Sequence, residues 1–150
     1  MSSFRHLLGR QNVVLDTMVW IYFFEAHARY GELCKQLLLQ VEAGSFSAVL
    51  TPITLAELIV KPLRQHRQDR ATQYRSAMQT MTNVRLLAFS VHDGWLAGSL
   101  CAKYALRLPD AMQVAAALSA ERPTLVTNDK ALARVKEVEI VLLNDLLHHG

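Results

Sequence analysis

Residues 13–24 read VVLDTMVWIYFF, and this stretch sets the fold expected for the chain. The apolar run at residues 13–15 is typical of a strand buried on both faces of a sheet. Asp16 ends the run, and the apolar and aromatic residues that follow predict a helix through residue 27. Because sites in parallel sheets form beyond the carboxyl ends of strands, an acid at this position is the first indication of function.

Further apolar runs alternate with helical patterns along the rest of the chain. They predict strands at residues 46–50, 84–89, 124–127 and 139–143. Between them we expect helices, including an alanine-rich one after residue 108, and a break at Lys61-Pro62 because proline lacks an amide donor. Alternating strands and helices predict a parallel sheet with helices on both faces. Residues 1–11 are expected to form a loose lead-in, and the end of the chain a short tail.

Length and composition fit one globular domain over residues 1–150. Apolar residues make up 51% of the chain and charged residues 19%, which excludes a disordered protein. The mean hydropathy of +0.14 is high for a domain of this size, and favours an apolar face covered by a partner.

No stretch predicts a membrane span. The longest apolar segment, residues 13–24, is interrupted by an acid and is shorter than the roughly 20 residues that a spanning helix needs. The first eleven residues lack the apolar region of a signal peptide, so we expect a cytoplasmic protein. Cys34 and Cys101 are then expected to be unpaired packing residues.

Basic residues concentrate between Lys61 and Arg75, although the formal net charge is only +3. Candidate RNA-binding arginines in this part are Arg64, Arg67, Arg70 and Arg75. The spacing of the first three places them near one face of a helix, where they can contact phosphates. A solvated surface helix is the alternative interpretation.

Four carboxylates differ from the other acidic residues because they lie in apolar stretches: Asp16, Glu57, Asp110 and Asp129. Burying an unpaired carboxylate costs several kcal/mol, so each needs a partner. One interpretation is helix capping. The two outer aspartates would be N-caps, Glu57 would form a capping box with Thr54, and Asp110 would lie in a first helical turn.

Capping alone does not account for the four acids together. Serine, threonine or asparagine caps equally well, and Ser90 with Asp93 has the capping-box pattern in a polar setting. Four acids at one sheet edge would repel each other unless a divalent cation neutralises them. Oxygen ligands without histidine or cysteine favour Mg²⁺ or Mn²⁺, which commonly serve phosphoryl chemistry.

Four segments in this order resemble the PIN domain family, and most closely its VapC-type toxin ribonucleases. The segments are VVLDTMVWIYFFE (13–25), TPITLAELIVKP (51–62), LRLPDAMQVAAAL (106–118) and LVTNDKALARV (125–135). The resemblance covers residues 13–142. It implies a PIN-like three-layer α/β/α sandwich with a central, mostly parallel five-stranded sheet.

The resemblance also implies a function. It implies a Mg²⁺- or Mn²⁺-dependent endoribonuclease that hydrolyses RNA to 5′-phosphate and 3′-hydroxyl ends. It assigns the metal to Asp16, Glu57, Asp110 and Asp129. A homodimer and an antitoxin protein are the partners it implies. Thr127 and Asn128 are secondary candidates that would hold the acids or a phosphate oxygen, unless they only form a turn.

One departure from the family pattern lies beside the first acid. The family usually has asparagine or serine where this chain has Met18. This departure supports one alternative, a non-catalytic PIN-like scaffold that binds RNA or protein. A solitary RNA-processing nuclease is a second alternative, which the absence of a neighbouring antitoxin gene would favour. The same apolar residues after Asp16 exclude haloacid-dehalogenase phosphatases and receiver domains, and the absence of a glycine-rich loop there excludes a Rossmann nucleotide site.

Overall fold

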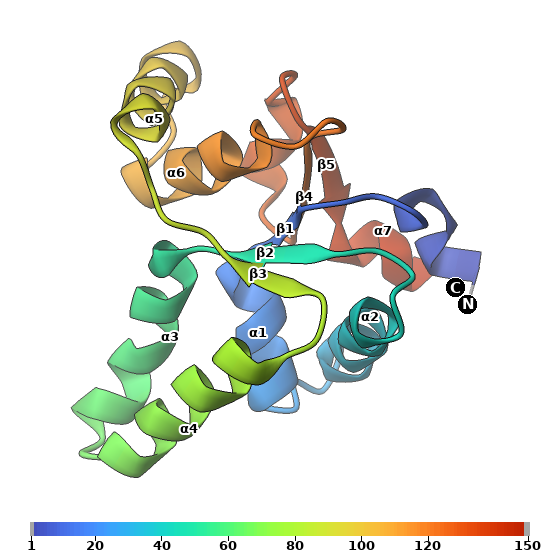
Figure 1. Cartoon of the computed structure of the whole chain (residues 1–150), viewed down its shortest axis with the longest axis vertical. Helices are drawn as coiled ribbons and strands as arrows, with labels where there is room; N and C mark the ends of the chain where they lie inside the picture. The colour runs from blue at the N-terminus through green and yellow to red at the C-terminus, as the bar shows by residue number, and fades with distance from the viewer. Residues whose placement is uncertain (1, 149–150) are drawn as a thin grey trace.

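The computed structural model describes residues 2–148 and has a five-stranded sheet between two layers of helices (Figure 1). The strands are β1 (Val13–Leu15), β2 (Ala48–Leu50), β3 (Val84–Leu86), β4 (Thr124–Thr127) and β5 (Glu139–Leu142). They lie in the order β3-β2-β1-β4-β5, and every neighbouring pair is parallel. The predicted mostly parallel sheet is confirmed, and it is parallel throughout.

Helices cover both faces of the sheet. One layer contains α1 (Thr17–Phe24), α2 (Gly31–Glu42), α3 (Pro52–Arg64), α4 (Gln68–Thr80) and α7 (Leu143–His148). The opposite layer contains α5 (Val91–Tyr104) and α6 (Leu108–Ala117), which pack against each other. Two 3-10 helices are η1 (Ser2–Leu7) and η2 (Lys130–Arg134). Within residues 2–148, no helix has the length and apolar character needed to cross a membrane.

Strand β1 shows how the sequence produces three layers. Its side chains alternate between the faces of the sheet, as in any strand. Val13 and Leu15 belong to the core under α1 and α2, whereas Val14 belongs to the core under α5 and α6. All three side chains are 0% exposed, so an uninterrupted apolar run is what this central strand requires.

The sheet topology places three strand ends side by side. Strand β1 is central, with β2 on one side and β4 on the other, because the chain runs from β1 through β2 to β3 on one side and then crosses to β4 and β5 on the other. The residues at these carboxyl ends are Asp16 after β1, Thr51 after β2 and Thr127 at the end of β4. Such a reversal of strand order opens a crevice at the carboxyl edge, where α/β proteins bind their ligands.

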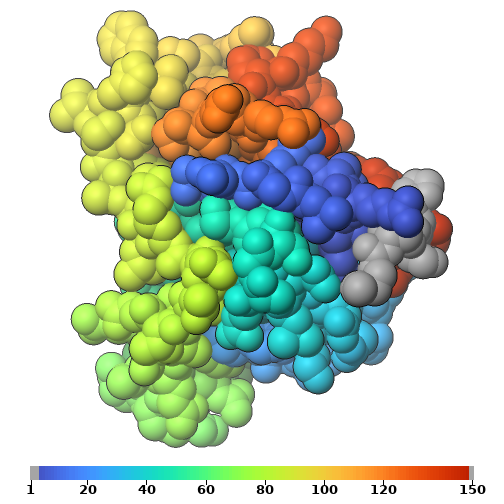
Figure 2. Space-filling view, turned by 45° about the vertical axis from the view of Figure 1, so that its right-hand side comes forward, coloured from blue at the N-terminus to red at the C-terminus, as the bar shows by residue number. Residues whose placement is uncertain are grey.

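Two predictions about the chain ends are wrong. The described part of the expected loose lead-in forms η1, which buries Phe4 and Leu7 in the core. In Figure 2 the dark-blue residues of this segment lie at the right-hand side of the molecule, and the blue chain that follows runs across its face. The expected tail is helix α7, which buries Leu143 and Leu146. In both segments apolar residues three apart supply one buried helical face.

The predicted helix break at Lys61-Pro62 is also wrong. Helix α3 continues to Arg64, and the chain turns at residues 65–67 before α4. Pro62 lies in the last turn of α3 and is buried, and α3 packs against α4. Pro62 removes one amide hydrogen bond from α3, and its burial against neighbouring residues compensates for that loss. The free state predicted for Cys34 and Cys101 is confirmed.

Candidate active site

Asp16 is the buried centre of the site. It follows β1 and forms the N-cap of α1, where its Oδ1 accepts a hydrogen bond from the Thr17 amide at 2.9 Å. Its Oδ2 accepts from the Thr127 hydroxyl at 2.7 Å. The residue is only 5% exposed, and this burial raises the pKa of Asp16 although its hydrogen bonds act in the opposite direction. Asp16 therefore caps α1 as predicted, and burying its ionised carboxylate at this position costs free energy.

Glu57 is joined to the same centre through Thr17. The Thr17 hydroxyl donates to Glu57 Oε1 at 2.8 Å, so α1 and α3 present their acids side by side. The predicted capping box of Glu57 with Thr54 is wrong. The N-cap of α3 is Thr51, whose hydroxyl oxygen accepts from the Thr54 amide. Glu57 lies on the exposed side of α3, where its carboxylate is not used by the helix end.

Gln113 is a site residue that the sequence analysis missed. It lies on α6 at 1% exposed, and its side-chain amide donates to Asp16 Oδ1 at 3.2 Å and to Thr54 Oγ1 at 2.8 Å. Its carbonyl oxygen accepts from the Thr51 hydroxyl. The available signal was a polar residue within an alanine-rich buried helix, three positions after Asp110 and therefore on the same face.

Asp110 lies in the first turn of α6, as predicted, and its carboxylate pairs with Arg107. The Arg107 Nε donates to Asp110 Oδ2 at 3.2 Å. Asp110 is close enough to Asp16 for its negative charge to contribute to the raised pKa of Asp16. The pKa of Arg107 is raised by Asp110 first, and also by the charges of Glu57 and Asp129. Arg107 therefore lies within the electrostatic reach of three of the four predicted acids.

Asp129 caps η2, with its Oδ1 accepting from the Ala131 amide at 2.9 Å. Thr127 connects it to the centre, because the hydroxyl that donates to Asp16 also accepts from the Asp129 amide at 3.1 Å. Asn128 makes different contacts. Its Oδ1 accepts from the backbone amide of Asn144 on α7, and its own backbone amide donates to the Met18 sulfur. Of the two secondary candidates, only Thr127 contacts an acid.

The four predicted acids thus lie around one edge of the sheet, on the residues that follow β1 and β4 and on α3 and α6. Across residues 2–148, no three Asp, Glu, His or Cys side chains converge closely enough to hold one metal ion as they stand. Their chemistry nevertheless fits a hard divalent cation, since all the donors are carboxylates. The Arg107 guanidinium pairs with one of them, Asp110, and the charges of Glu57 and Asp129 also act on it.

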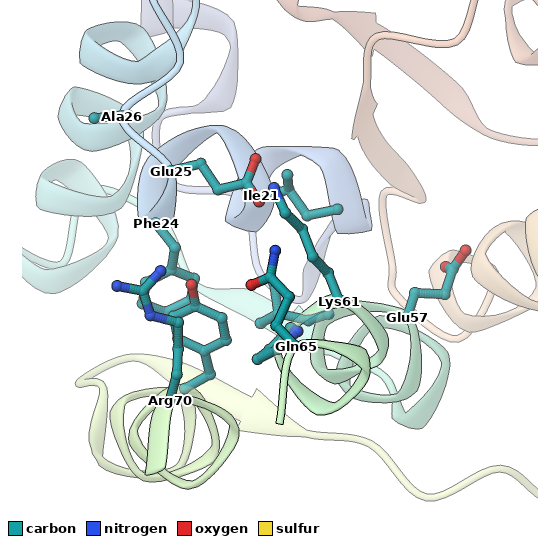
Figure 3. A pocket seen from close by; sticks show the side chains of 11 residues that line it. Ile21, Phe24, Glu25, Ala26, Glu57, Lys61, Gln65 and Arg70 are labelled. Atoms are coloured by element: carbon teal, nitrogen blue, oxygen red, sulfur yellow. Dashed lines mark hydrogen bonds and ion pairs between the residues drawn. The ribbon is translucent and has the colours of Figure 1, made fainter. Parts of the chain in front are cut away.

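A pocket of about 640 Å³ extends from Glu57 between α1, α3 and α4 (Figure 3). Glu57 stands at one end, and the cations Lys61 and Arg70 line the walls. The Lys61 Nζ pairs with Glu25 at 2.8 Å. The Tyr74 ring, stacked on Phe24 at 4.4 Å between centroids, supplies an aromatic wall. The pocket therefore combines positive charge and an aromatic surface beside an acid of the site.

The prediction that three arginines share one helix face is wrong. Arg64 ends α3, Arg67 precedes α4 as its N-cap, and Arg70 lies within α4, because the helix break falls at residues 65–67. Arg67 pairs with Asp69 at 3.0 Å, and Arg75 lines a separate small pocket. Only Arg70 of the four predicted arginines lines the pocket that contains Glu57.

Comparisons with known proteins agree with this fold. The PIN domain family model matches residues 13–138. The chain is similar to a chain of VapBC2 from Rickettsia felis bound to a DNA fragment from their promoter. The TM-score is 0.69 at 17% identity, over 85% of this chain and 96% of that one.

A second similar structure is a toxin-antitoxin complex from Klebsiella pneumoniae, with a TM-score of 0.65 and 23% identity. It covers 88% of this chain and 98% of that one. No match is found among curated proteins. The family model matches most of the chain, so the chain belongs to the PIN domain family.

Proposed function

We propose that this PIN domain is a metal-dependent endoribonuclease that hydrolyses RNA phosphodiester bonds. The family implies nuclease activity, and the observation that carries the proposal is the setting of Asp16. This carboxylate is buried, has a raised pKa and lies near further acids. A fold that needed only a helix cap would have no reason to retain such a destabilising charge, so a functional role is favoured.

Asp16, Asp110, Asp129 and Glu57 are the residues that would hold Mg²⁺ or Mn²⁺ in this proposal. When bound, such an ion polarises the scissile phosphate and lowers the pKa of bound water. Thr127 fixes the orientation of the Asp16 carboxylate through a hydrogen bond. The acids repel RNA by themselves, so Arg70 in the adjacent pocket would bind its phosphates.

The decisive experiment compares the wild-type protein with Asp16→Asn on a mixed RNA pool. The wild type is expected to cleave with Mg²⁺ or Mn²⁺ and not with EDTA, leaving 5′-phosphate and 3′-hydroxyl ends. Asp16→Asn keeps the shape and is expected to abolish cleavage without unfolding the protein, as judged by circular dichroism. Asp145→Asn, on the exposed side of α7, is the matched control. Cleavage by Asp16→Asn, or by the wild type in EDTA, would contradict the proposal.

We further propose that this nuclease is the toxin of a VapBC-type pair, with an antitoxin protein as partner. This proposal is supported by the two similar structures, whose descriptions are of toxin-antitoxin assemblies. A short neighbouring reading frame with a DNA-binding fold, whose product co-purifies with this chain and suppresses cleavage, is the expected finding. A chain that stands alone in its operon would instead favour a solitary RNA-processing nuclease.

A non-catalytic scaffold is the second candidate, and Met18 is the observation that favours it. In that case RNA binding would persist while no divalent cation supported cleavage. The homodimer and the cytoplasmic location stay predictions. Light scattering after size exclusion tests the first, and fractionation of cells tests the second.

A further inference from the structure

Arg107 occupies a position where local helix chemistry disfavours it. It is the N-cap of α6, and its side chain makes no capping hydrogen bond. Short polar or acidic side chains are preferred there because they accept from the free helix amides. A cation at this end also opposes the helix dipole. The residue therefore violates two local rules, and such violations are typical of functional positions.

The carboxylates of the site explain why a cation is tolerated at this position. Arg107 pairs with Asp110 at 3.2 Å, and the charges of Glu57 and Asp129 also act on it. Asp110 in turn acts on the buried Asp16. The side chain of Arg107 is 78% exposed while that of Asp110 is 16% exposed, so the arginine can leave without disturbing the core.

We propose that Arg107 is the counter-ion that neutralises the acidic site in the metal-free protein, and that it leaves Asp110 when a divalent cation binds. The release of Arg107 on metal binding rests on the proposed function, whereas its role as a counter-ion does not. A guanidinium and a metal ion cannot both use Asp110 Oδ2 as their closest partner, so the two cations compete. The competition sets how much free divalent cation is needed to load the site.

Metal affinity tests the competition directly. Binding of Mn²⁺ alone, followed by the electron paramagnetic resonance of the free ion, is compared between the wild type and Arg107→Gln. Loss of the competing charge is expected to tighten binding about two- to fivefold, the range that a single exposed ion pair supplies. Arg107→Lys keeps the charge and is expected to bind close to the wild type.

The matched control is Arg122→Gln, which removes the same charge at the opposite edge of the sheet, just before β4. Charges beyond about 10 Å are largely screened at 0.1 M salt, so this variant is expected to resemble the wild type. Equal tightening by both variants, or equal or weaker binding by Arg107→Gln, would overturn the proposal.

Thermal unfolding in EDTA tests the neutralising role without any metal. Removing a cation from a helix N-terminus should by itself raise Tm. A lower Tm for Arg107→Gln, by about 2 °C or more, is instead expected because the acids then repel each other. An unchanged or higher Tm for Arg107→Gln would refute the counter-ion role of Arg107. If no variant binds Mn²⁺, the proposed function fails, and the result in EDTA still decides the role of Arg107.

Discussion

Gln113 donates a hydrogen bond from its side-chain amide to Asp16, a residue 97 positions earlier in the chain, at 3.2 Å. The same amide binds Thr54, and the carbonyl oxygen accepts from Thr51. One buried side chain on α6 therefore ties together the residues that follow β1 and β2. The orientation of the central acid depends on a residue that carries no charge.

Replacing Gln113 with leucine is expected to remove both stability and activity. The change removes the acceptor of the Thr51 hydroxyl and a donor to Thr54 and Asp16, and each buried group left unsatisfied costs about 1–3 kcal/mol. Urea unfolding measures the loss, and RNA cleavage is expected to fall because the Asp16 carboxylate is no longer held. Gln73→Leu, on the exposed surface of α4, is the control that should leave both unchanged. Full activity in Gln113→Leu would show that Asp16 needs no such support.

The raised pKa of Asp16 predicts how stability changes with pH in the metal-free protein. A raised pKa means that the folded protein binds this proton more tightly than the unfolded chain does. The ionised carboxylate thus destabilises the fold at neutral pH. This penalty disappears as the pH falls through the raised pKa and below the ordinary aspartate value.

Asp16→Asn removes this penalty while it removes activity. In EDTA at pH 7.5 its Tm is expected to exceed that of the wild type, and the difference should shrink as the pH is lowered. Thermal scans across the pH range measure this trend, with Asp145→Asn as a control that should show no such convergence. A lower Tm for Asp16→Asn at neutral pH would mean that its hydrogen bonds outweigh its burial.

The sequence was sufficient to predict the sheet, because its strands depend on local apolar patterns. The strand at residues 13–15 is apolar at every position, and a central strand of a parallel sheet requires this. Asp16 and Asp129 directly follow strands or begin helices, so their edge of the sheet could be inferred.

Other features depend on contacts between distant segments, and local patterns do not contain them. Gln113 acts on partners 59 to 97 positions away, so only the folded chain reveals its role. The position of the α3–α4 turn depends on how Pro62 packs. Because the sequence predicted the helix break at Pro62, it wrongly placed three arginines on one helix face. The partner of Arg107 was hidden because a basic residue three positions before an acid also fits an ordinary surface pair.

Met18 connects α1 to the turn that carries Asp129. Its sulfur accepts from the amide of Asn128, the residue before Asp129. Met18→Leu keeps the size but removes the acceptor, and is expected to lower cleavage and to cost about 1 kcal/mol of stability. Met18→Asn supplies an oxygen acceptor, as the usual family residue would, and is expected to retain more activity. If Met18→Leu is as active as the wild type, the sulfur has only a packing role.

The basic residues near the site are expected to contribute unequally to RNA binding. Arg70 lines the pocket beside Glu57, whereas Arg75 lines another pocket on the same helix. In an Asp16→Asn background, which prevents cleavage, Arg70→Gln should weaken binding of single-stranded RNA. It should also reduce the slope of log affinity against log salt by about 0.7, the value for one phosphate contact on a single strand.

Arg75→Gln is the matched control, because it removes the same charge from α4 away from the Glu57 pocket. Its salt slope is expected to stay near that of the parent protein. Arg67→Gln should also have a small effect, since Arg67 already pairs with Asp69. Equal losses of RNA affinity in all three variants would mean that binding depends only on the overall charge of this region. The pocket beside Glu57 would then have no role in positioning the substrate.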